Sequence, residues 1–205
     1  MSTAQDLLII TLDMPSARPV ERGDLSLALA AAELIDLLTA GVVTLVEEER
    51  IVPAAEPPVV EGVLAEAAAS LPEQEPPESV DDWLWRRGRG LSAAYLEALE
   101  AEGKLAKERQ RRLLVLHTDR MVLVDSPARH RAANRWAADE PVLIALAAAV
   151  GIRIRQIDEA AGVTDDAVAT VLAAVVDALT ELANERTRRA RKLQEAATDN
   201  VQRGY

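Results

Sequence analysis

The sequence predicts a mainly α-helical, single-domain protein, and three observations support this prediction. Alanine and leucine dominate the composition, while Phe is absent and only two Tyr occur, so helix formers outnumber the aromatic residues that strands favour. Hydrophobic residues make up 49% and charged residues 28% of the chain, as in ordinary folded proteins. A length of 205 residues suits one domain with a substantial core, expected to cover 1–205 with a basic end at 186–205 that could fray.

The first third of the chain is predicted to contain two helical segments and a short hairpin. Residues 4–12 are apolar and suit a helix by composition, although residues 9–11 would also suit a strand. A helix is expected from Asp24, a good N-cap residue, to Ala40, because Gly41 is a typical helix terminator. After Gly41, two short apolar runs flank a polar turn at 47–50, which predicts a hairpin.

The middle of the chain is predicted to contain three helices, a stiff connector and a second, longer hairpin. Helical spacing at 59–70 is followed by a proline- and glutamate-rich connector, and Ser79 is placed to cap the next helix. A helix at 91–102 should end at Gly103. We expect the hairpin at 104–124, with its apolar runs 113–116 and 121–124 separated by a turn at 117–120.

The last third of the chain is predicted to be helical. Helices are expected at 128–137 and at 141–150, the second beginning with a proline, which is favoured at a helix start. A long helix opens at Thr164-Asp165 and carries apolar residues at spacings of three and four up to Leu182, which predicts one face packed on the core. Beyond Leu182 the helix becomes basic and is expected to be solvated.

Charge is distributed unevenly along the chain, whose net charge is −11. Residues 1–85 hold 3 basic and 17 acidic residues, whereas residues 86–135, which we call the basic island, hold 12 basic and 6 acidic ones. An overall negative charge disfavours a protein that embraces nucleic acid with its whole surface, since that affinity comes mainly from neutralised phosphates. The basic island could form one anion-binding face, or its arginines could pair with the acidic residues of the first third.

The residue types argue against an enzyme and against a metal centre. The chain has no cysteine and only two histidines, His117 and His130, and it lacks the usual nucleophile and phosphate-loop motifs. We therefore expect no catalytic residue, no cofactor and no bound metal. Acidic Asp6 precedes the first apolar run and no basic segment comes before it, which predicts a cytoplasmic protein without an export signal. The longest uncharged run, 142–152, is too short to span a bilayer.

The second hairpin suggests two different functions. With the helix before it, the hairpin resembles the helix and wing of a winged helix, whose arginines contact nucleic-acid phosphates. The same hairpin combines basic residues with the apolar run 113–116, which suits shallow insertion into an anionic membrane. A third possibility is that this apolar run simply alternates between core and solvent in a buried ribbon.

Four segments, in order, resemble the Golgi phosphoprotein 3 family, and specifically a bacterial member of actinobacterial type. They are Asp6–Asp13, an apolar helix ending in an acidic residue; Ala32–Leu37 with Gly41, a helix running into a hairpin; Pro76–Trp83, a proline pair followed by acidic, hydroxyl and valine residues and a tryptophan; and Leu99–Leu105 with the basic and apolar run after it. The resemblance runs from about Gln5 to the last helix. It implies a central helix bundle ringed by amphipathic helices, with hairpins at the periphery.

The resemblance also implies a function. Relatives in eukaryotes are non-enzymatic adaptors that bind phosphatidylinositol 4-phosphate at the Golgi membrane and hold glycosyltransferases there. Of the four positions that form their lipid pocket, only Arg89 matches here; the others fall near Glu21, at Ala30 and at Ser92. Specific recognition of phosphatidylinositol 4-phosphate is therefore not expected, because a phosphomonoester needs several convergent donors. Arg86 and Arg87 lie beside Arg89 and could serve in a different geometry.

These observations predict a peripheral membrane adaptor on the cytoplasmic face, binding anionic lipid or a phosphoinositide-like headgroup. The alternatives are a nucleic-acid-binding regulator that uses 104–124 as a wing and a protein-interaction module without lipid binding. A protein client and a homo-oligomer formed through the hairpin, whose edge can pair with another chain, are further candidate partners. The expected headgroup-binding residues are Arg86, Arg87, Arg89, Trp83 and Trp85, and the expected membrane-contact residues are Arg109, Arg111, Arg112, Leu113, Leu114, Val115 and Leu116.

Overall fold

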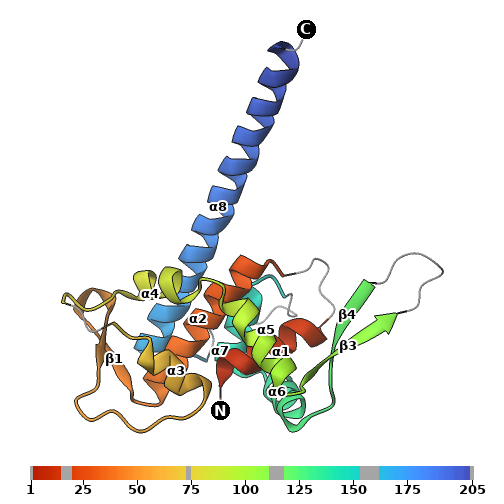
Figure 1. Cartoon of the computed structure of the whole chain (residues 1–205). Coiled ribbons are helices and arrows are strands. Elements are labelled where there is room, and N and C mark those ends of the chain that lie inside the picture. Colours follow the sequence, from red (N-terminus) through yellow and green to blue (C-terminus); the bar gives the residue numbers. More distant parts are fainter. Residues whose placement is uncertain (1, 15–19, 73–74, 111–117, 153–161, 204–205) are drawn as a thin grey trace.

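The computed structural model describes residues 2–14, 20–72, 75–110, 118–152 and 162–203 (Figure 1). Within these residues the chain forms eight α-helices and two separate two-stranded antiparallel sheets. One continuous cluster of buried apolar side chains connects the helices, so the fold is mainly α and forms one domain, as the sequence predicted. None of the helices in the described residues is long and apolar enough to cross a membrane.

Helix α2 (Arg22–Thr39) lies at the centre of the bundle, in contact with α1, α3, α4, α5, α7 and α8. It is buried on almost every side because its middle is mostly apolar, with the unbroken Leu and Ala run Leu27–Ala32, which suits a helix with no solvent-facing stripe. Helix α1 (Thr3–Asp13) packs beside it, so the uncertain segment 4–12 is a helix and not a strand. Gly41 ends α2 with a φ of 72°, the left-handed conformation predicted for it.

Three short helices cover one side of α2: α3 (Val63–Ala69), α4 (Val80–Arg87) and α5 (Leu91–Ala101). The Ser79 hydroxyl accepts a hydrogen bond from the Asp82 N–H and caps α4, as the sequence predicted. Gly88 allows the chain to turn tightly after α4 and against α2, because a Cβ at this position would lie 2.5 Å from the Leu84 carbonyl oxygen of α4 and 3.4 Å from atoms of Ser26 and Leu27 on α2. This close approach fixes where the following residue, Arg89, leaves the body.

Two hairpins lie on opposite sides of the bundle (Figure 1). The first pairs β1 (Val43–Val46) with β2 (Arg50–Pro53) around a 3-10 turn, as predicted. The second pairs β3 (Leu105–Gln110) with β4 (Thr118–Leu123). The predicted turn at 117–120 is wrong for residues 118–120, which belong to β4. The backbone register instead pairs buried Leu105 with buried Leu123, which anchors both strands to the core.

The C-terminal part is helical, with α6 (Pro127–Ala137), α7 (Pro141–Ala149) and α8 (Asp166–Arg203). Asp165 caps α8 by accepting hydrogen bonds from the Ala167 and Val168 N–H groups. The first half of α8 packs on α2, α4 and α7 through an apolar stripe that includes buried Val171 and Val175. Its second half remains helical through the basic stretch that could have frayed, and it extends away from the other helices (Figure 1).

Candidate functional site

The predicted headgroup-binding residues gather on α4 and on the turn that follows it. Trp83 and Arg87 are four residues apart and share the face of α4 that meets α2, because residues at this spacing lie one turn apart. Trp85 lies on another face of the same helix, Arg86 lies one turn after Trp83 and closer to solvent, and Arg89 follows Gly88 on the turn to α5. The short helix therefore separates neighbouring residues of the sequence into different environments.

Arg87 is bound to a buried carboxylate. Its Nε and Nη2 donate hydrogen bonds of 2.7 and 2.9 Å to the two carboxylate oxygens of Glu33, whose side chain is 1% exposed. The Tyr95 hydroxyl donates a third hydrogen bond, of 3.0 Å, to the same carboxylate. The bonds to Glu33 raise the pKa of Arg87, and burial together with the Glu33 charge raises the pKa of Tyr95. Glu33, Arg87 and Tyr95 form a satisfied buried network that ties α2, α4 and α5 together.

Arg86 is also paired, although it lies closer to solvent. Its Nε and Nη2 donate bonds of 2.6 and 2.7 Å to the carboxylate of buried Glu78, and these bonds raise the pKa of Arg86. Its guanidinium also lies 5.3 Å from the centre of the Trp83 ring, within the range of a cation–π contact. The bidentate geometry matches the planar fork of arginine to the carboxylate of Glu78.

The two tryptophans of α4 have different surroundings. Trp83 is fully buried, and its indole N–H donates a 3.0 Å hydrogen bond to the carbonyl oxygen of Ala30. Trp83, which the sequence predicts among the headgroup-binding residues, therefore packs inside the core. Trp85 is half-buried and borders a cleft of about 460 Å³ between α4 and α8, which Arg186, Arg188 and Arg189 also line.

Ser92, where the family resemblance places a pocket arginine, has a structural role here. Its N–H donates to the Ser26 hydroxyl, which in turn donates to the Ser92 hydroxyl oxygen at 2.9 Å. The Ser92 hydroxyl donates to the backbone carbonyl of Arg22. These bonds fasten the first turn of α5 to the first turn of α2, so that Arg22 and Arg89 lie at the same corner of the bundle.

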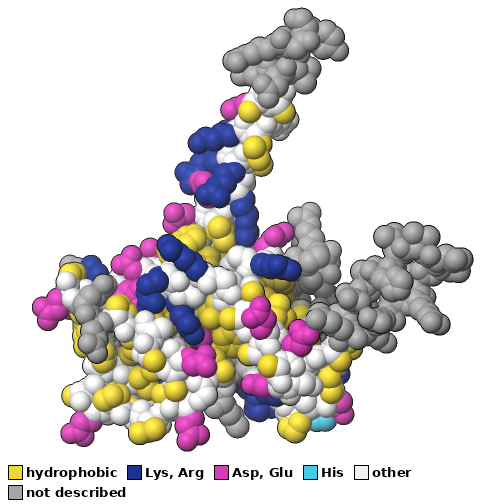
Figure 2. All heavy atoms as spheres, viewed as in Figure 1, with side chains coloured by type: hydrophobic (Ala, Val, Ile, Leu, Met, Phe, Trp, Pro, Cys, Tyr) yellow, Lys and Arg dark blue, Asp and Glu magenta, His cyan; other side chains and the backbone are white. Residues whose placement is uncertain are grey.

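Three elements bring cations to this corner. The side chains of Arg22 and Arg89 are exposed and have no ion-pair partner within the described part of the chain. Arg186 of α8 reaches the start of α2, where its Nη1 donates to Asp24 at 2.7 Å. The next turns of α8 are strongly basic, and Figure 2 shows Lys and Arg side chains gathered along α8 and around its base. We call this the cationic surface: Arg22, Arg89, Arg186, Arg188, Arg189, Arg191 and Lys192.

Sequence reasoning missed Arg22 and the way in which Arg186 reaches α2. The predicted helix began at Asp24, which left Arg22 in a connector, although α2 starts two residues earlier. In the structure, Gly23 leaves room for the Arg186 guanidinium, because a Cβ at this position would lie 2.8 Å from Arg186 Nη2. The sequence predicts the basic end of α8 as a solvated tail, so the contact of Arg186 with the start of α2 is not expected from it.

The predicted membrane-contact residues fall almost entirely outside the described residues. Residues 111–117, which include Arg111, Arg112 and the apolar run 113–116, are not described, and Arg109 is described only as a backbone position of β3. Their predicted roles stay predictions. Within the residues that the structure does describe, no cluster of three or more His, Asp or Glu side chains is arranged to hold a metal ion.

The arrangement can be compared with known proteins. The family description Golgi phosphoprotein 3 (GPP34) matches residues 4–203, nearly the whole chain. The chain belongs to the Golgi phosphoprotein 3 family. Curated proteins offer no match to this sequence. The resemblance seen in the sequence is thus confirmed at the level of the family, and membership in the Golgi phosphoprotein 3 family fits an adaptor role.

Proposed function

We propose that this chain is a peripheral membrane adaptor that binds anionic lipid headgroups through the cationic surface, with the β3–β4 hairpin as its apolar contact. The observation that carries the proposal is the exposure of Arg22 and Arg89 without acidic partners, beside the basic turns of α8. In a chain of net charge −11, such a local surface is the region that an anionic bilayer attracts.

The α4 residues have supporting roles in this proposal. Arg86 and Arg87 hold α4 in place through their bonds to Glu78 and Glu33. Trp83 fixes α4 on α2, and half-buried Trp85 borders the cleft at the base of α8. Each Lys or Arg close to an anionic bilayer contributes about 1 kcal/mol, so several cations on one surface suffice for reversible association.

The hairpin supplies the second part of the proposal. Membrane association that rests on charge alone is weak at physiological salt, because surface charges are screened over about 10 Å. Apolar side chains that enter the headgroup boundary add a contribution that salt does not screen. Leu113, Leu114, Val115 and Leu116, with Arg109, Arg111 and Arg112 before them, have the composition for such a contact.

The experiment is cosedimentation of the full chain with vesicles of neutral lipid and with vesicles containing anionic lipid, each at low and moderate salt. We expect sedimentation with the anionic vesicles only, decreasing as salt rises. A Leu113→Ser/Leu114→Ser variant should bind less. The matched control, Val46→Ser/Val59→Ser, changes two exposed valines in and after the other hairpin and should bind like the native chain. Circular dichroism verifies that both variants stay folded.

The same samples separate this proposal from its alternatives. Fluorescence anisotropy with labelled duplex DNA, at the same two salt concentrations, tests whether 104–124 acts as a wing. Binding to DNA without binding to either vesicle would favour the nucleic-acid regulator. Absence of binding to vesicles and DNA would contradict the lipid proposal and leave a protein-interaction module.

A further inference from the structure

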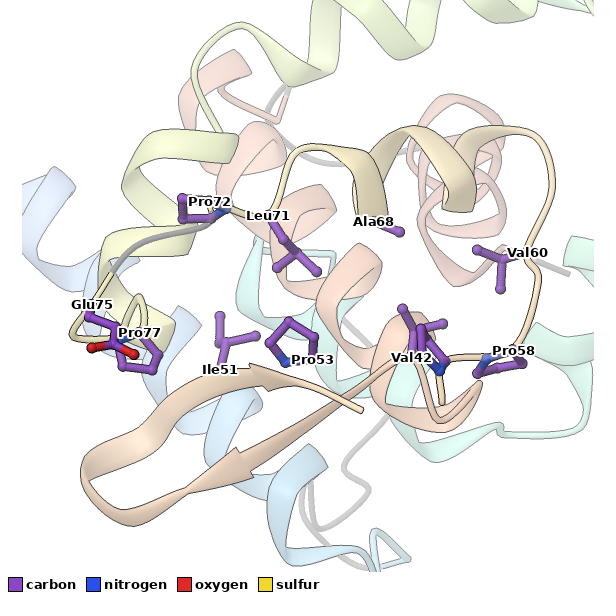
Figure 3. A pocket seen from close by; sticks show the side chains of 11 residues that line it. Val42, Ile51, Pro53, Pro58, Val60, Ala68, Leu71, Pro72, Glu75 and Pro77 are labelled. Carbon is purple, nitrogen blue, oxygen red and sulfur yellow. The ribbon is translucent and has the colours of Figure 1, made fainter. Parts of the chain in front are cut away.

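A cleft of about 600 Å³ lies beside β1, β2 and α3 (Figure 3), on the side of the bundle away from the hairpin β3–β4 (Figure 1). Its walls come from the first hairpin, from α3 and from the two loops that flank α3. Five of its lining residues are prolines, whose fixed φ angles make the walls stiff before anything binds. The lining residues are Val42, Ile51, Pro53, Pro57, Pro58, Val60, Ala68, Leu71, Pro72, Glu75 and Pro77. A volume of this size suits an apolar group with a few polar contacts.

The cleft favours a cationic occupant. Glu75 is its one charged lining residue, and an ionised carboxylate can only accept hydrogen bonds. Prolines have no N–H group, so five of the lining residues offer carbonyl acceptors and no backbone donor. Segment 42–82 as a whole carries eleven acidic residues and one basic residue, Arg50, which donates to the Pro77 carbonyl at 3.1 Å. The site thus suits an apolar side chain accompanied by a cation.

The second half of α8 has the complementary composition. Residues 187–198 are all exposed, and the helix continues to Arg203, so the segment 187–203, which we call the α8 arm, extends about 25 Å beyond the packed part. Residues 186–193 include five basic residues and no acidic one. Leu193 is 72% exposed on the arm. A single helix of this length without tertiary contacts is marginally stable in water, so a partner surface would stabilise it.

The surroundings of Leu193 on the arm match the cleft in size and charge. Residues three and four positions away lie on the same face of a helix, and here they are Ala190, Ala196, Ala197 and Arg189. Because three of these residues are alanines, the helix backbone can approach the edge of the cleft closely. Arg189 is bound only to Glu185, an exposed pair four residues apart, and pairs of this kind contribute little and are easily exchanged.

We propose that two copies of this chain form a dimer in which the α8 arm of each copy docks on the proline-lined cleft of the other. Leu193 enters the cleft, and Arg189 exchanges Glu185 for Glu75 of the second copy. Because each copy provides one arm and one cleft, the contact can close with two-fold symmetry. The proposal does not depend on lipid binding. It uses a surface different from the β3–β4 hairpin, and Arg189 of the cationic surface takes part in it.

The first experiment is sedimentation equilibrium of the full chain over a range of concentrations and at two salt concentrations. We expect a monomer–dimer equilibrium that weakens as salt rises. Leu193→Asp should weaken dimerisation at least about tenfold, because an apolar side chain that would be buried is replaced by a charge inside an acidic site. The matched control is Thr187→Asp, which places the same charge on another face of the α8 arm and should change the dissociation constant less than about twofold.

A charge exchange provides an independent test through exposed side chains, which do not endanger folding. Glu75→Arg alone and Arg189→Glu alone should each weaken the dimer, and combining them in one chain should restore it. A monomer at every concentration would overturn the proposal, and so would equal effects of Leu193→Asp and Thr187→Asp. A dimer that is lost in Leu113→Ser/Leu114→Ser but kept in Leu193→Asp would assign the interface to the β3–β4 hairpin and also overturn it.

Discussion

Arg87 and Arg89 are two residues apart in the sequence and have opposite roles in the structure. Arg87 lies on the face of α4 that meets α2, where it is bound to the buried Glu33 carboxylate. Arg89 lies beyond Gly88, is exposed and has no acidic partner in the described chain. The same side chain thus stabilises the fold at one position and remains available to an anion at the other. Position relative to the central helix decides which role an arginine has.

The same division extends along the basic island. Arg129 pairs with Asp13, while Arg131 and Arg135 both reach buried Asp6. Of the two outcomes that the charge distribution left open, pairing with the acidic first third therefore accounts for these arginines as well as for Arg86 and Arg87. The cationic surface is what remains at the corner where α2 and α5 begin, together with the base of α8.

The largest expected effect, on the free energy of unfolding, comes from removing the acidic partner of Arg87. Glu33→Gln leaves the Arg87 guanidinium without a counter-charge in a mostly buried position and removes a carboxylate acceptor from Tyr95. We expect a loss of about 3 kcal/mol in the free energy of unfolding, because removing one partner of a buried ion pair leaves the other charge uncompensated. Urea denaturation followed by circular dichroism measures this loss.

A nearby glutamate provides the control for this measurement. Glu66 on α3 is exposed, and it acts on Arg87 only through a longer-range Coulombic interaction. Glu66→Gln should change the free energy of unfolding by less than about 0.5 kcal/mol, as is usual for surface substitutions. Equal destabilisation by the two variants would mean that Arg87 responds to the general acidity of the region and not to its bidentate partner.

The sequence predicted the helices well because their signals are local. Ser79, Gly41 and Asp165 each mark a helix end through the conformation or hydrogen bond of one or two residues, and all three act as predicted. The second hairpin was placed less accurately, because apolar composition suggested a turn at 117–120. Its register is set by Leu105 and Leu123, whose burial depends on the bundle that they pack against.

The site could be predicted only in part, because its charges are neutralised over long sequence separations. Nothing near Arg87 in the sequence identifies Glu33, 54 residues away, as its partner. The apparent run of basic residues at 86–89 therefore overstated the free positive charge of α4. Arg22 lies near Arg89 because α5 packs on α2, and Arg186 of α8 reaches the start of α2 because α8 packs on α2. No local pattern in the sequence reports that packing.

Replacing the exposed arginines Arg22 and Arg89 is expected to have a smaller effect, which falls on membrane binding and not on stability. Arg22→Gln/Arg89→Gln should weaken binding to anionic vesicles by about thirtyfold, at about 1 kcal/mol for each cation lost near the membrane. The free energy of unfolding should stay within about 0.5 kcal/mol of the native value. Quantitative cosedimentation gives the first quantity and urea denaturation the second. A stability loss comparable to that of Glu33→Gln would show that these arginines are structural.

The smallest effect concerns Asp36, which lies three residues after Glu33 on α2 and has no ion pair among the described residues. Its carboxylate accepts a 2.6 Å hydrogen bond from the Thr3 N–H at the start of α1. Burial nevertheless raises the pKa of Asp36 above its ordinary value of 3.8, against the opposing hydrogen bonds from Thr3 and the charge of Arg135. Comparing Asp36 with Glu33 therefore tests what a directly bound cation adds to a buried carboxylate.

A raised pKa in the folded state means that the folded protein holds its proton more tightly than the unfolded chain. The corresponding stability is fully present below the ordinary pKa and is lost as pH rises through the folded pKa. We therefore expect the native chain to lose stability relative to Asp36→Asn as pH rises from about 3.8 through the raised pKa of folded Asp36. Above that folded pKa, the difference in stability should not change further. Urea denaturation at a series of pH values measures this difference. The opposite trend would mean that the Thr3 hydrogen bonds and the charge of Arg135 outweigh burial.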